Sequence, residues 1–248
     1  MSIKKAIILS AGQGSRLLPL TQDQPKCLIP FGGKTLIEWQ IAALAANGIE
    51  HIVVVTGFRT EIVEAHLARI EGPRIHVRFN PFFQVADNLG SCWIARDEMD
   101  QDFIILNGDT LVSPAIIATL IAQSQAPITV TIDIKSSYDD DDMKVNREGT
   151  RLIAIGKTLT PTESNAESIG MLAFRGRGPQ IFRDQVDRMM RTPDGVKRWY
   201  LRAINELAPQ DVVGVVSIAE LEWAEVDFPA DLEIAGALAN RWATGAFR

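Results

Sequence analysis

Short apolar runs alternate with longer segments of helical period over the first 134 residues, and this alternation restricts the possible folds more than any other feature of the chain. The apolar runs are continuous, as in strands buried on both faces. They are AIILS (6–10), HIVVVTG (51–57), IHVRFN (75–80), FIILNGD (103–109) and ITVTIDI (128–134). The segments between them predict helices, the first of which opens with a capping box from Thr35 to Glu38. The pattern predicts an α/β protein with a Rossmann-like, doubly wound, mostly parallel sheet.

The pattern loosens after residue 135. An acidic turn, YDDDDMK, precedes two strand-like segments, LIAIGK and SIGMLAF, and helical stretches follow near 179–192 and 199–207. The chain then continues through VVGVVSIA and EWAEVD to a helix expected at 230–242. Because no repeat, low-complexity tract or linker interrupts it, we expect a single domain, 1–248, with a small insertion in its second half.

Composition excludes some classes of function. The 248 residues are 46% hydrophobic, which is enough for a sizeable core, and the net charge is −6 with Lys and Arg scattered. This balance argues against nucleic-acid and anionic-membrane partners, although a local basic pocket is compatible with it. Cys27 and Cys92 have no metal-type spacing, and no segment approaches the roughly 20 apolar residues of a membrane helix. We expect a cytoplasmic protein with reduced thiols and no cleaved signal.

The stretch LSAGQGSRLLPLTQDQPKCL (9–28) follows the first predicted strand and has the character of a phosphate-binding loop. A dinucleotide fingerprint would need a third glycine where the chain has Leu17, and an acidic residue where the second strand ends in Thr56 and Gly57. A Walker loop ending in GGKT (32–35) would need glycine where the chain has Leu28. What remains is a glycine-rich turn open to an anion, with Arg16 and Lys26 as cations for phosphate oxygens.

This stretch resembles the signature of the nucleoside-diphosphate-sugar pyrophosphorylases, L-x-A-G-x-G-[ST]-R-x-x-P-L-T followed shortly by P-K. The resemblance implies the nucleotidyltransferase fold. It also implies that Arg16 stabilises the triphosphate and the leaving pyrophosphate, and that Lys26 binds phosphate. The loop backbone would hold the nucleotide through Leu9, Ala11, Gly12, Gly14 and Ser15.

Two aspartates close predicted strands and are candidate metal ligands. Asp109 ends FIILNGD and Asp227 ends EWAEVD. An aspartate at a strand end is as often a turn former or helix cap, but the crevice of a doubly wound sheet lies at these carboxyl ends. Nucleotidyl transfer brings two anionic phosphates together and needs a divalent cation, so we expect Mg²⁺ here. The family resemblance implies the same pair.

The segments NPFFQVADNLGSCWIA, YDDDDMKV, ESIGMLAF and WAEVDFPADLEIA resemble the phosphocholine cytidylyltransferase-like branch of this superfamily, which also acts on aminoethylphosphonate and inositol phosphate. From the positions of the matching segments, the resemblance implies that the base and ribose contact Asn80, Asn88 and Ser91. The acceptor would contact Lys144 and Lys157 through its phosphate, and Glu167 beyond it. Solvated ion pairs explain the lysines almost as well. A cationic head group would suit the acidic run and the face of Trp199 or Trp223, but core burial explains a tryptophan equally well.

These observations predict a cytidylyltransferase that moves CMP from CTP to a small phosphate or phosphonate acceptor and releases pyrophosphate. The three histidines are expected to be structural, because an anionic acceptor oxygen needs no general base. A sugar-1-phosphate nucleotidyltransferase using UTP or dTTP is the nearer alternative, and a non-catalytic nucleotide-binding module is the alternative of another class. A glycosyltransferase would be expected to show Asp-x-Asp where this chain has Asn107 and Asp109. A monomer or a homodimer would be compatible with the sequence.

Overall fold

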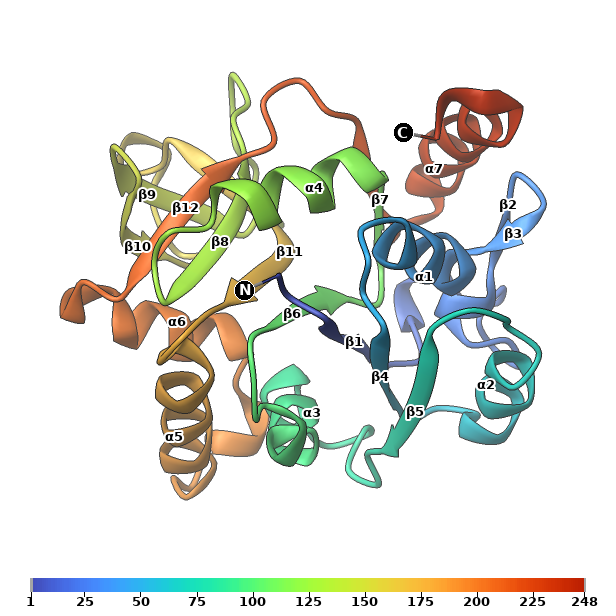
Figure 1. The fold of residues 1–248 in the computed structure, drawn as a ribbon, viewed down its shortest axis with the longest axis horizontal. Helices are drawn as coiled ribbons and strands as arrows, with labels where there is room; N and C mark the ends of the chain where they lie inside the picture. Colours follow the sequence, from blue (N-terminus) through green and yellow to red (C-terminus); the bar gives the residue numbers. More distant parts are fainter. Residues whose placement is uncertain (1, 248) are drawn as a thin grey trace.

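A nine-stranded mixed sheet runs through the computed structural model, which describes residues 2–247 (Figure 1). Met1 and Arg248, the ends of the predicted domain, lie outside the described residues. The strand order is β5-β4-β1-β6-β11-β8-β12-β10-β9. The strands are β1 (Lys5–Ser10), β4 (His51–Thr56), β5 (Arg74–Phe79), β6 (Phe103–Asn107), β8 (Ile128–Asp133), β9 (Lys144–Glu148), β10 (Arg151–Ile155), β11 (Ala166–Phe174) and β12 (Val213–Ser217).

The direction of the strands differs between the two halves of the sheet. Strands β5, β4, β1 and β6 pair in parallel, as the sequence pattern predicts. β11 lies antiparallel between β6 and β8, β12 is parallel to β8, and β10 is antiparallel to both β12 and β9. The α/β class is therefore confirmed, whereas the second half of the sheet is mixed. A buried apolar run has the same composition in either direction, so the direction of β11 was not predictable from its residues.

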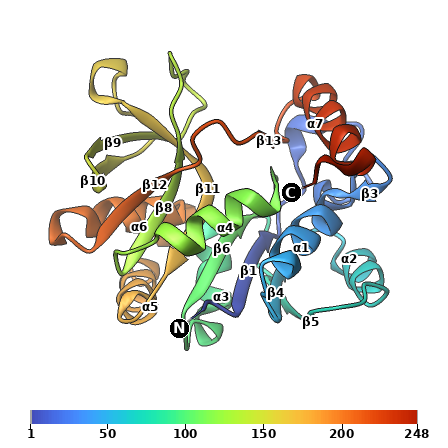
Figure 2. The ribbon, with the colours of Figure 1, turned by 45° about the horizontal axis from the view of Figure 1, so that its top comes forward.

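Helices cover both faces of the sheet (Figure 2). One face packs against α1 (Leu36–Ala46), α2 (Thr60–Leu67) and α4 (Pro114–Gln123). The other packs against α3 (Asn88–Ile94), α5 (Gly178–Met190) and α6 (Tyr200–Leu207). The capping box predicted at α1 is present, with the Thr35 hydroxyl accepting from the Glu38 amide and the Glu38 carboxylate accepting from the Thr35 amide.

The C-terminal helix α7 (Pro229–Arg241) stands beside the hairpin of β2 (Pro30–Phe31) and β3 (Lys34–Thr35) in both ribbon views (Figures 1 and 2). An aromatic cluster attaches this end of the chain to α1. The Trp39 ring lies 5.8 Å from that of Trp242 and 4.9 Å from that of Phe247, between centroids. The Trp39 indole also donates to the Phe31 carbonyl at 2.9 Å. The C-terminal end of α7 is thereby held against α1.

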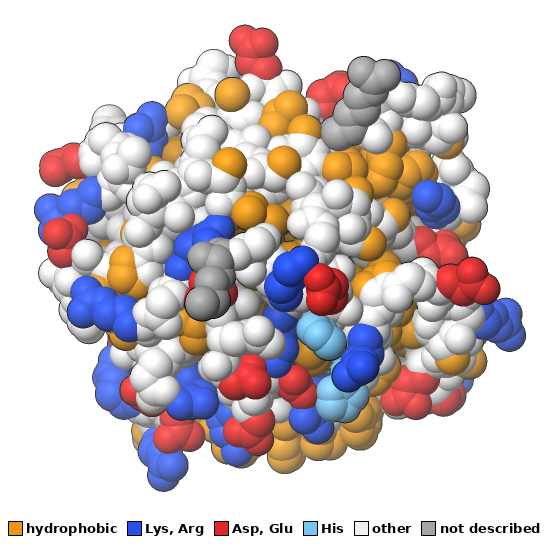
Figure 3. Space-filling view, viewed as in Figure 1, with side chains coloured by type: hydrophobic (Ala, Val, Ile, Leu, Met, Phe, Trp, Pro, Cys, Tyr) orange, Lys and Arg blue, Asp and Glu red, His pale blue; other side chains and the backbone are white. Residues whose placement is uncertain are grey.

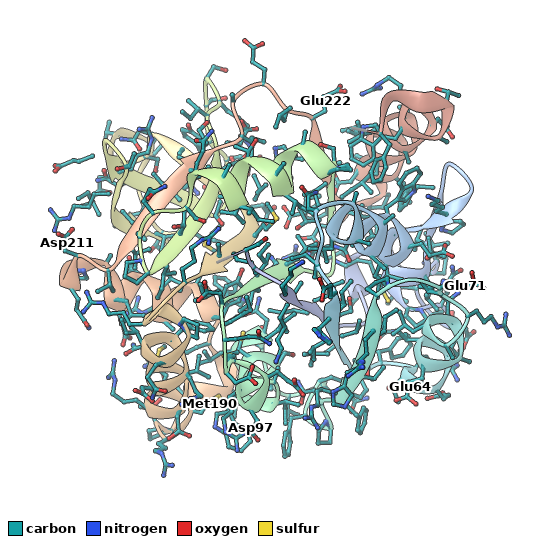
Figure 4. The ribbon with its side chains drawn as sticks, in the orientation of Figure 1. Glu64, Glu71, Asp97, Met190, Asp211 and Glu222 are labelled. Atoms are coloured by element: carbon teal, nitrogen blue, oxygen red, sulfur yellow. The ribbon has the colours of Figure 1, made fainter. Side chains whose placement is uncertain are left out.

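Charged side chains of both signs are interspersed over the face shown in Figure 3, with no large area of one sign on that face. Several labelled in Figure 4, such as Glu64, Asp211 and Glu222, extend outward from the edge of the molecule. No helix formed by residues 2–247 has both the length and the apolar character required to cross a lipid bilayer.

Candidate active site

The glycine-rich loop leaves β1 at the carboxyl edge of the parallel strands and brings two cations to that edge. Gly14 adopts the left-handed conformation, with φ of 77°, and a Cβ built there would lie 3.1 Å from Lys26 Cβ and Cδ. Glycine at this position therefore lets the Lys26 side chain pass directly over the loop. Arg16 and Lys26 lie in short 3-10 turns, Ser15–Leu17 and Lys26–Leu28.

Three carboxylates meet opposite these cations. Asp109 follows β6 and precedes β7 (Thr110–Val112), which pairs antiparallel with β13 (Trp223–Glu225). The Val226 amide continues this ladder by donating to the Asp109 carbonyl at 3.0 Å. As a result, one carboxylate oxygen from each of Asp109, Glu225 and Asp227 lies within 4.8 Å of the others.

Lys26 bridges two of these carboxylates. Its Nζ donates to Asp109 Oδ2 at 2.9 Å and to Asp227 Oδ1 at 2.7 Å, and Arg16 Nη1 donates to Asp227 Oδ2 at 2.9 Å. Burial alone would favour the neutral amine, but the charges of Asp109 and Asp227 outweigh it and raise the pKa of Lys26. Burial likewise opposes ionisation of Asp227, yet Lys26 and Arg16 keep the pKa of that carboxyl below its usual value.

Glu225 is a site residue that the sequence analysis missed. Although Glu225 is exposed, partial desolvation by the surrounding protein, together with the charges of Asp109 and Asp227, raises the pKa of its carboxyl to about 8. The available signal was the spacing Glu-x-Asp in EVD, because alternate residues of an extended segment face the same side. The three carboxylates supply hard oxygen ligands of the kind that Mg²⁺ prefers, and the residues present fit a divalent cation.

Three cavities surround this cluster and contain most of the predicted loop residues. One of about 170 Å³ is lined by Leu9, Gly12, Gly14, Lys26, Asn88 and Asp109. Another of about 450 Å³ is lined by Gly12, Gly14, Ser15, Arg16 and Asp227. Ala11 is buried, and its carbonyl accepts from the Phe58 amide at 3.0 Å. The loop therefore opens onto space on both sides of Lys26 and Arg16.

The third cavity, of about 190 Å³, extends from the carboxylates toward the second half of the sheet. Arg16, Asp109 and Asp227 line one end, and Asp142, Lys157, Glu167 and Trp199 are among the other lining residues. Lys157 Nζ lies 5.3 Å from the centroid of the Trp199 ring and 3.7 Å from Asp141 Oδ1. Lys157 and Glu167, both predicted to contact the acceptor, therefore share a cavity with the predicted metal ligands.

Three predicted contact residues lie elsewhere. Asn80 and Ser91 are buried and bonded to each other, with Asn80 Nδ2 donating to Ser91 Oγ at 3.1 Å, and they line none of the described cavities around the cluster. Lys144 is 2% exposed, and its Nζ donates to the Lys157 carbonyl at 3.0 Å. These three side chains are therefore bonded to other parts of the protein and do not line the three cavities.

Glu167 lies in a second charged group, of which Glu167 was predicted from the sequence and its partner Lys135 was not. Its carboxylate accepts from Lys135 Nζ at 2.8 Å, and Lys135 also pairs with Asp142 at 3.0 Å. Burial is the main reason that the pKa of Glu167 rises to about 7, although Lys135 opposes the change. Lys135 was not among the predicted site residues.

A larger cavity of about 630 Å³ lies away from these groups, between the loop 219–222 and α7. Trp223 lines it and donates from its indole nitrogen to Asp133 Oδ2 at 2.9 Å. Of the two tryptophans considered for a cationic head group, Trp199 is therefore the one that lines the cavity containing the carboxylates.

The fold and the site together define an α/β protein in which a predicted phosphate-binding loop lies beside a carboxylate cluster. Residues 5–142, more than half of the chain, match the family model of the nucleotidyl transferases. The chain belongs to this family.

Similar proteins agree with this assignment. CTP:phosphoglutamine cytidylyltransferase of Campylobacter jejuni is 25% identical over 92% of this chain and 98% of its own length. CMP-5′-(3-aminopropyl)phosphonate synthase of Streptomyces rubellomurinus is 35% identical over 49% of this chain, but the match spans only 20% of that enzyme. Among solved structures, the inositol-1-phosphate CTP transferase from T. maritima has the same fold, with a TM-score of 0.84, 20% identity, and coverage of 100% of this chain and 99% of that one.

Proposed function

We propose that this protein transfers CMP from CTP to a small acceptor that carries a phosphate or phosphonate, and releases pyrophosphate. The proposal rests mainly on the ion pairs that join Arg16 and Lys26 of the glycine-rich loop region to Asp109 and Asp227. The similarity to two enzymes whose names specify CTP or CMP chemistry supports cytidine as the nucleoside.

The chain's own residues would bind and align the two substrates. Backbone amides of the loop 11–15 would hold the triphosphate, with Arg16 and Lys26 neutralising the phosphates that become pyrophosphate. A Mg²⁺ ion held by Asp109 and Asp227, with Glu225 beside them, would neutralise charge on the attacked phosphate. An acceptor oxygen would form a bond to the α-phosphorus as the bond to pyrophosphate breaks in line. No general base is required, because this oxygen is already anionic at neutral pH.

The far part of the 190 Å³ cavity would hold the acceptor. Lys157 would bind the acceptor's phosphate or phosphonate, since its ammonium lines the same cavity as Arg16 and Asp109. Glu167, Asp142 and the face of Trp199 would suit a cationic head group beyond that phosphate. This arrangement favours amine-bearing acceptors, such as phosphocholine or aminoethylphosphonate, over inositol phosphate. Asn88 would lie on the ribose side of the loop.

A matrix of four nucleoside triphosphates against phosphocholine, aminoethylphosphonate, inositol phosphate and hexose-1-phosphates, read out as pyrophosphate release, tests the proposal. We expect activity with CTP and at least one of the first three acceptors. Activity restricted to hexose-1-phosphates with UTP or dTTP would replace the proposal with the sugar-nucleotide alternative. Absence of pyrophosphate with every pair would favour the non-catalytic module. The cytoplasmic location, the absence of nucleic-acid partners and the monomeric or dimeric state stay predictions.

Removing Arg16 or Asp109 tests the assigned roles. Arg16→Ala and Asp109→Ala should each lower kcat/KM for pyrophosphate release by about 100-fold or more, as the loss of one preorganised charged group does in other enzymes. Arg241→Ala is the matched control, because Arg241 pairs with Glu222 beside the 630 Å³ cavity and does not line the three cavities of the site. A change within about threefold at Arg16 or Asp109 would contradict their roles.

A further inference from the structure

The ammonium of Lys26 occupies the position between Asp109 and Asp227 that a divalent cation would need. Its two contacts, 2.9 and 2.7 Å, are charge-assisted hydrogen bonds of full strength. Arg16 satisfies the second oxygen of Asp227 at 2.9 Å. In this state the carboxylates that would ligate the metal are already neutralised by the two cations that would bind the triphosphate.

We infer that Lys26 and Arg16 are exchangeable counter-ions, which hold the metal carboxylates until a nucleotide arrives and then move onto its phosphates. This inference rests on the proposed function, since it assumes that a triphosphate binds at the loop. Before the exchange, a metal entering alone would have to displace Lys26 or bind beside it against charge repulsion. After the exchange, the carboxylates are free for the metal and the cations are paired with phosphate.

The local structure allows this exchange without a change of backbone. Lys26 carries its charge on a flexible four-carbon stem, and its side chain passes over Gly14, into the same 170 Å³ cavity that Gly12 and Gly14 line. Arg16 lines the 450 Å³ cavity on the other side of the loop, and 47% of its side chain is exposed. Both cations can therefore reach the loop by side-chain rotation alone.

The exchange couples the two ligands. If the nucleotide removes the counter-ions, it strengthens metal binding, and by thermodynamic reciprocity the metal strengthens nucleotide binding by the same factor. The protein would then take up metal and nucleotide as a pair and would bind free divalent ions weakly. Phosphate oxygens that ligate the metal would couple the two ligands in any case. A mobile Lys26 adds to this coupling, whereas a rigid Lys26 ion pair would add nothing to it.

Binding of Mn²⁺ to the nucleotide-free protein, followed by the electron paramagnetic resonance signal of the free ion, tests the inference directly. Lys26→Met keeps a linear side chain of similar length and removes its charge. It should raise the affinity for Mn²⁺ by at least about tenfold, because a unit positive charge within about 4 Å of the site is lost. Lys4→Met is the control: it removes the same charge from an ion pair with Glu50 at the end of β1 opposite the loop, and should change the affinity by less than about threefold.

A Lys26→Met protein that is folded by circular dichroism and binds Mn²⁺ no more tightly than the wild type would overturn the inference. If that variant does not fold, Lys26→Gln is measured in its place, because it also removes the charge while its amide can still donate to a carboxylate oxygen. In either variant, the gain in Mn²⁺ affinity on adding the α,β-methylene analogue of CTP should be smaller than in the wild type. A folded Lys26→Gln protein with the Mn²⁺ affinity of the wild type would also overturn the inference. Neither measurement needs an acceptor, so failure of the acceptor matrix would refute the proposed reaction and leave this result standing.

Discussion

Glu167 is a carboxyl group held in an environment that favours its neutral form. Only 4% of its side chain is exposed, and it lies at the start of β11 beside Lys135 and Asp142. Because its pKa is about 7 in the folded protein and near 4.5 in a peptide, the folded protein holds a proton that the unfolded chain has released between these values. The free energy of unfolding should therefore fall as the pH rises from about 4.5 to about 7.

Glu167→Gln should remove this pH dependence. Relative to the wild type, the variant should gain on the order of 2 kcal/mol in free energy of unfolding between pH 5 and pH 7.5, measured by urea denaturation. Glu163→Gln is the control. That exposed carboxyl accepts from the Thr160 hydroxyl, which lowers its pKa, so no gain at higher pH is expected there. A difference between wild type and Glu167→Gln that stays constant over this range would contradict the assignment.

Site residues that belong to a sequence motif or a strand end were predictable. Whether other polar residues face the site depends on tertiary contacts and was not predictable. Arg16 and Lys26 follow from the spacing of the loop, and Asp109 and Asp227 from their places at strand ends; the structure brings all four together. Asn80 follows β5, Ser91 lies in α3 and Lys144 begins β9, and the side chains of all three bond to partners inside the protein. Sequence alone does not distinguish a polar group that faces a cavity from one that satisfies a buried partner.

At the scale of elements, β11 places Glu167 and Ser168 at the carboxyl edge of β6 because it runs antiparallel to β6. Its pairing with β8 shifts register between Ser168 and Leu172, around Gly170. Gly170 has a φ of 74°, and a Cβ there would lie 2.5 Å from Nδ2 of Asn107. This glycine lets the strand bend past the end of β6, so that both strands contribute to one cavity.

Gly170→Ala should therefore disturb both the fold and the site. We expect a loss of at least about 2 kcal/mol in free energy of unfolding, from the strained backbone and the contact with Asn107, together with lower activity. Gly236→Ala, within α7, meets no atom within 4 Å and should instead stabilise the protein by about 0.5–1 kcal/mol. Thermal or urea unfolding of both variants checks the contrast, and equal effects would refute this role for Gly170.

The elements of the first half were predictable because each is long, apolar and bounded by a turn or cap. The strands at 6–10, 51–57, 75–80 and 128–134 lie within a residue or two of β1, β4, β5 and β8. The predicted strand 103–109 ends two residues early, at Asn107, which leaves Gly108 and Asp109 in the turn. β9 has mixed polarity, KVNRE, and was not predicted as a strand, since its pairing with β10 and β11 is what keeps it extended.

At the scale of the whole molecule, the position of the carboxylates depends on how α7 is attached. Asp227 lies two residues before this helix, whose far end is held through Trp242 against Trp39. Trp242→Ala should lower the free energy of unfolding by about 3–5 kcal/mol, as the loss of a large buried aromatic side chain does. It should also lower activity under conditions in which the variant is still folded, because Asp227 loses part of its support.

Ile234→Ala is the control on the same helix: it shortens a side chain of α7 without touching the aromatic cluster around Trp242. Ile234 is 61% exposed, so its truncation should change the free energy of unfolding by no more than about 0.5 kcal/mol and leave activity close to that of the wild type. Urea denaturation and pyrophosphate release measure the two quantities. A Trp242→Ala protein as stable and active as Ile234→Ala would show that the aromatic cluster does not position the site.

The short β7–β13 ladder joins parts of the chain that are made at very different times. Asp109 emerges from the ribosome well before Trp223–Glu225, and the amide of Val226 must reach the Asp109 carbonyl to complete the ladder. A nascent chain that has emerged only to residue 220 already contains β1 to β12 but lacks two of the three carboxylates. The carboxylate cluster is therefore expected to be among the last parts of the protein to form during synthesis, so that incomplete chains lack the proposed metal site.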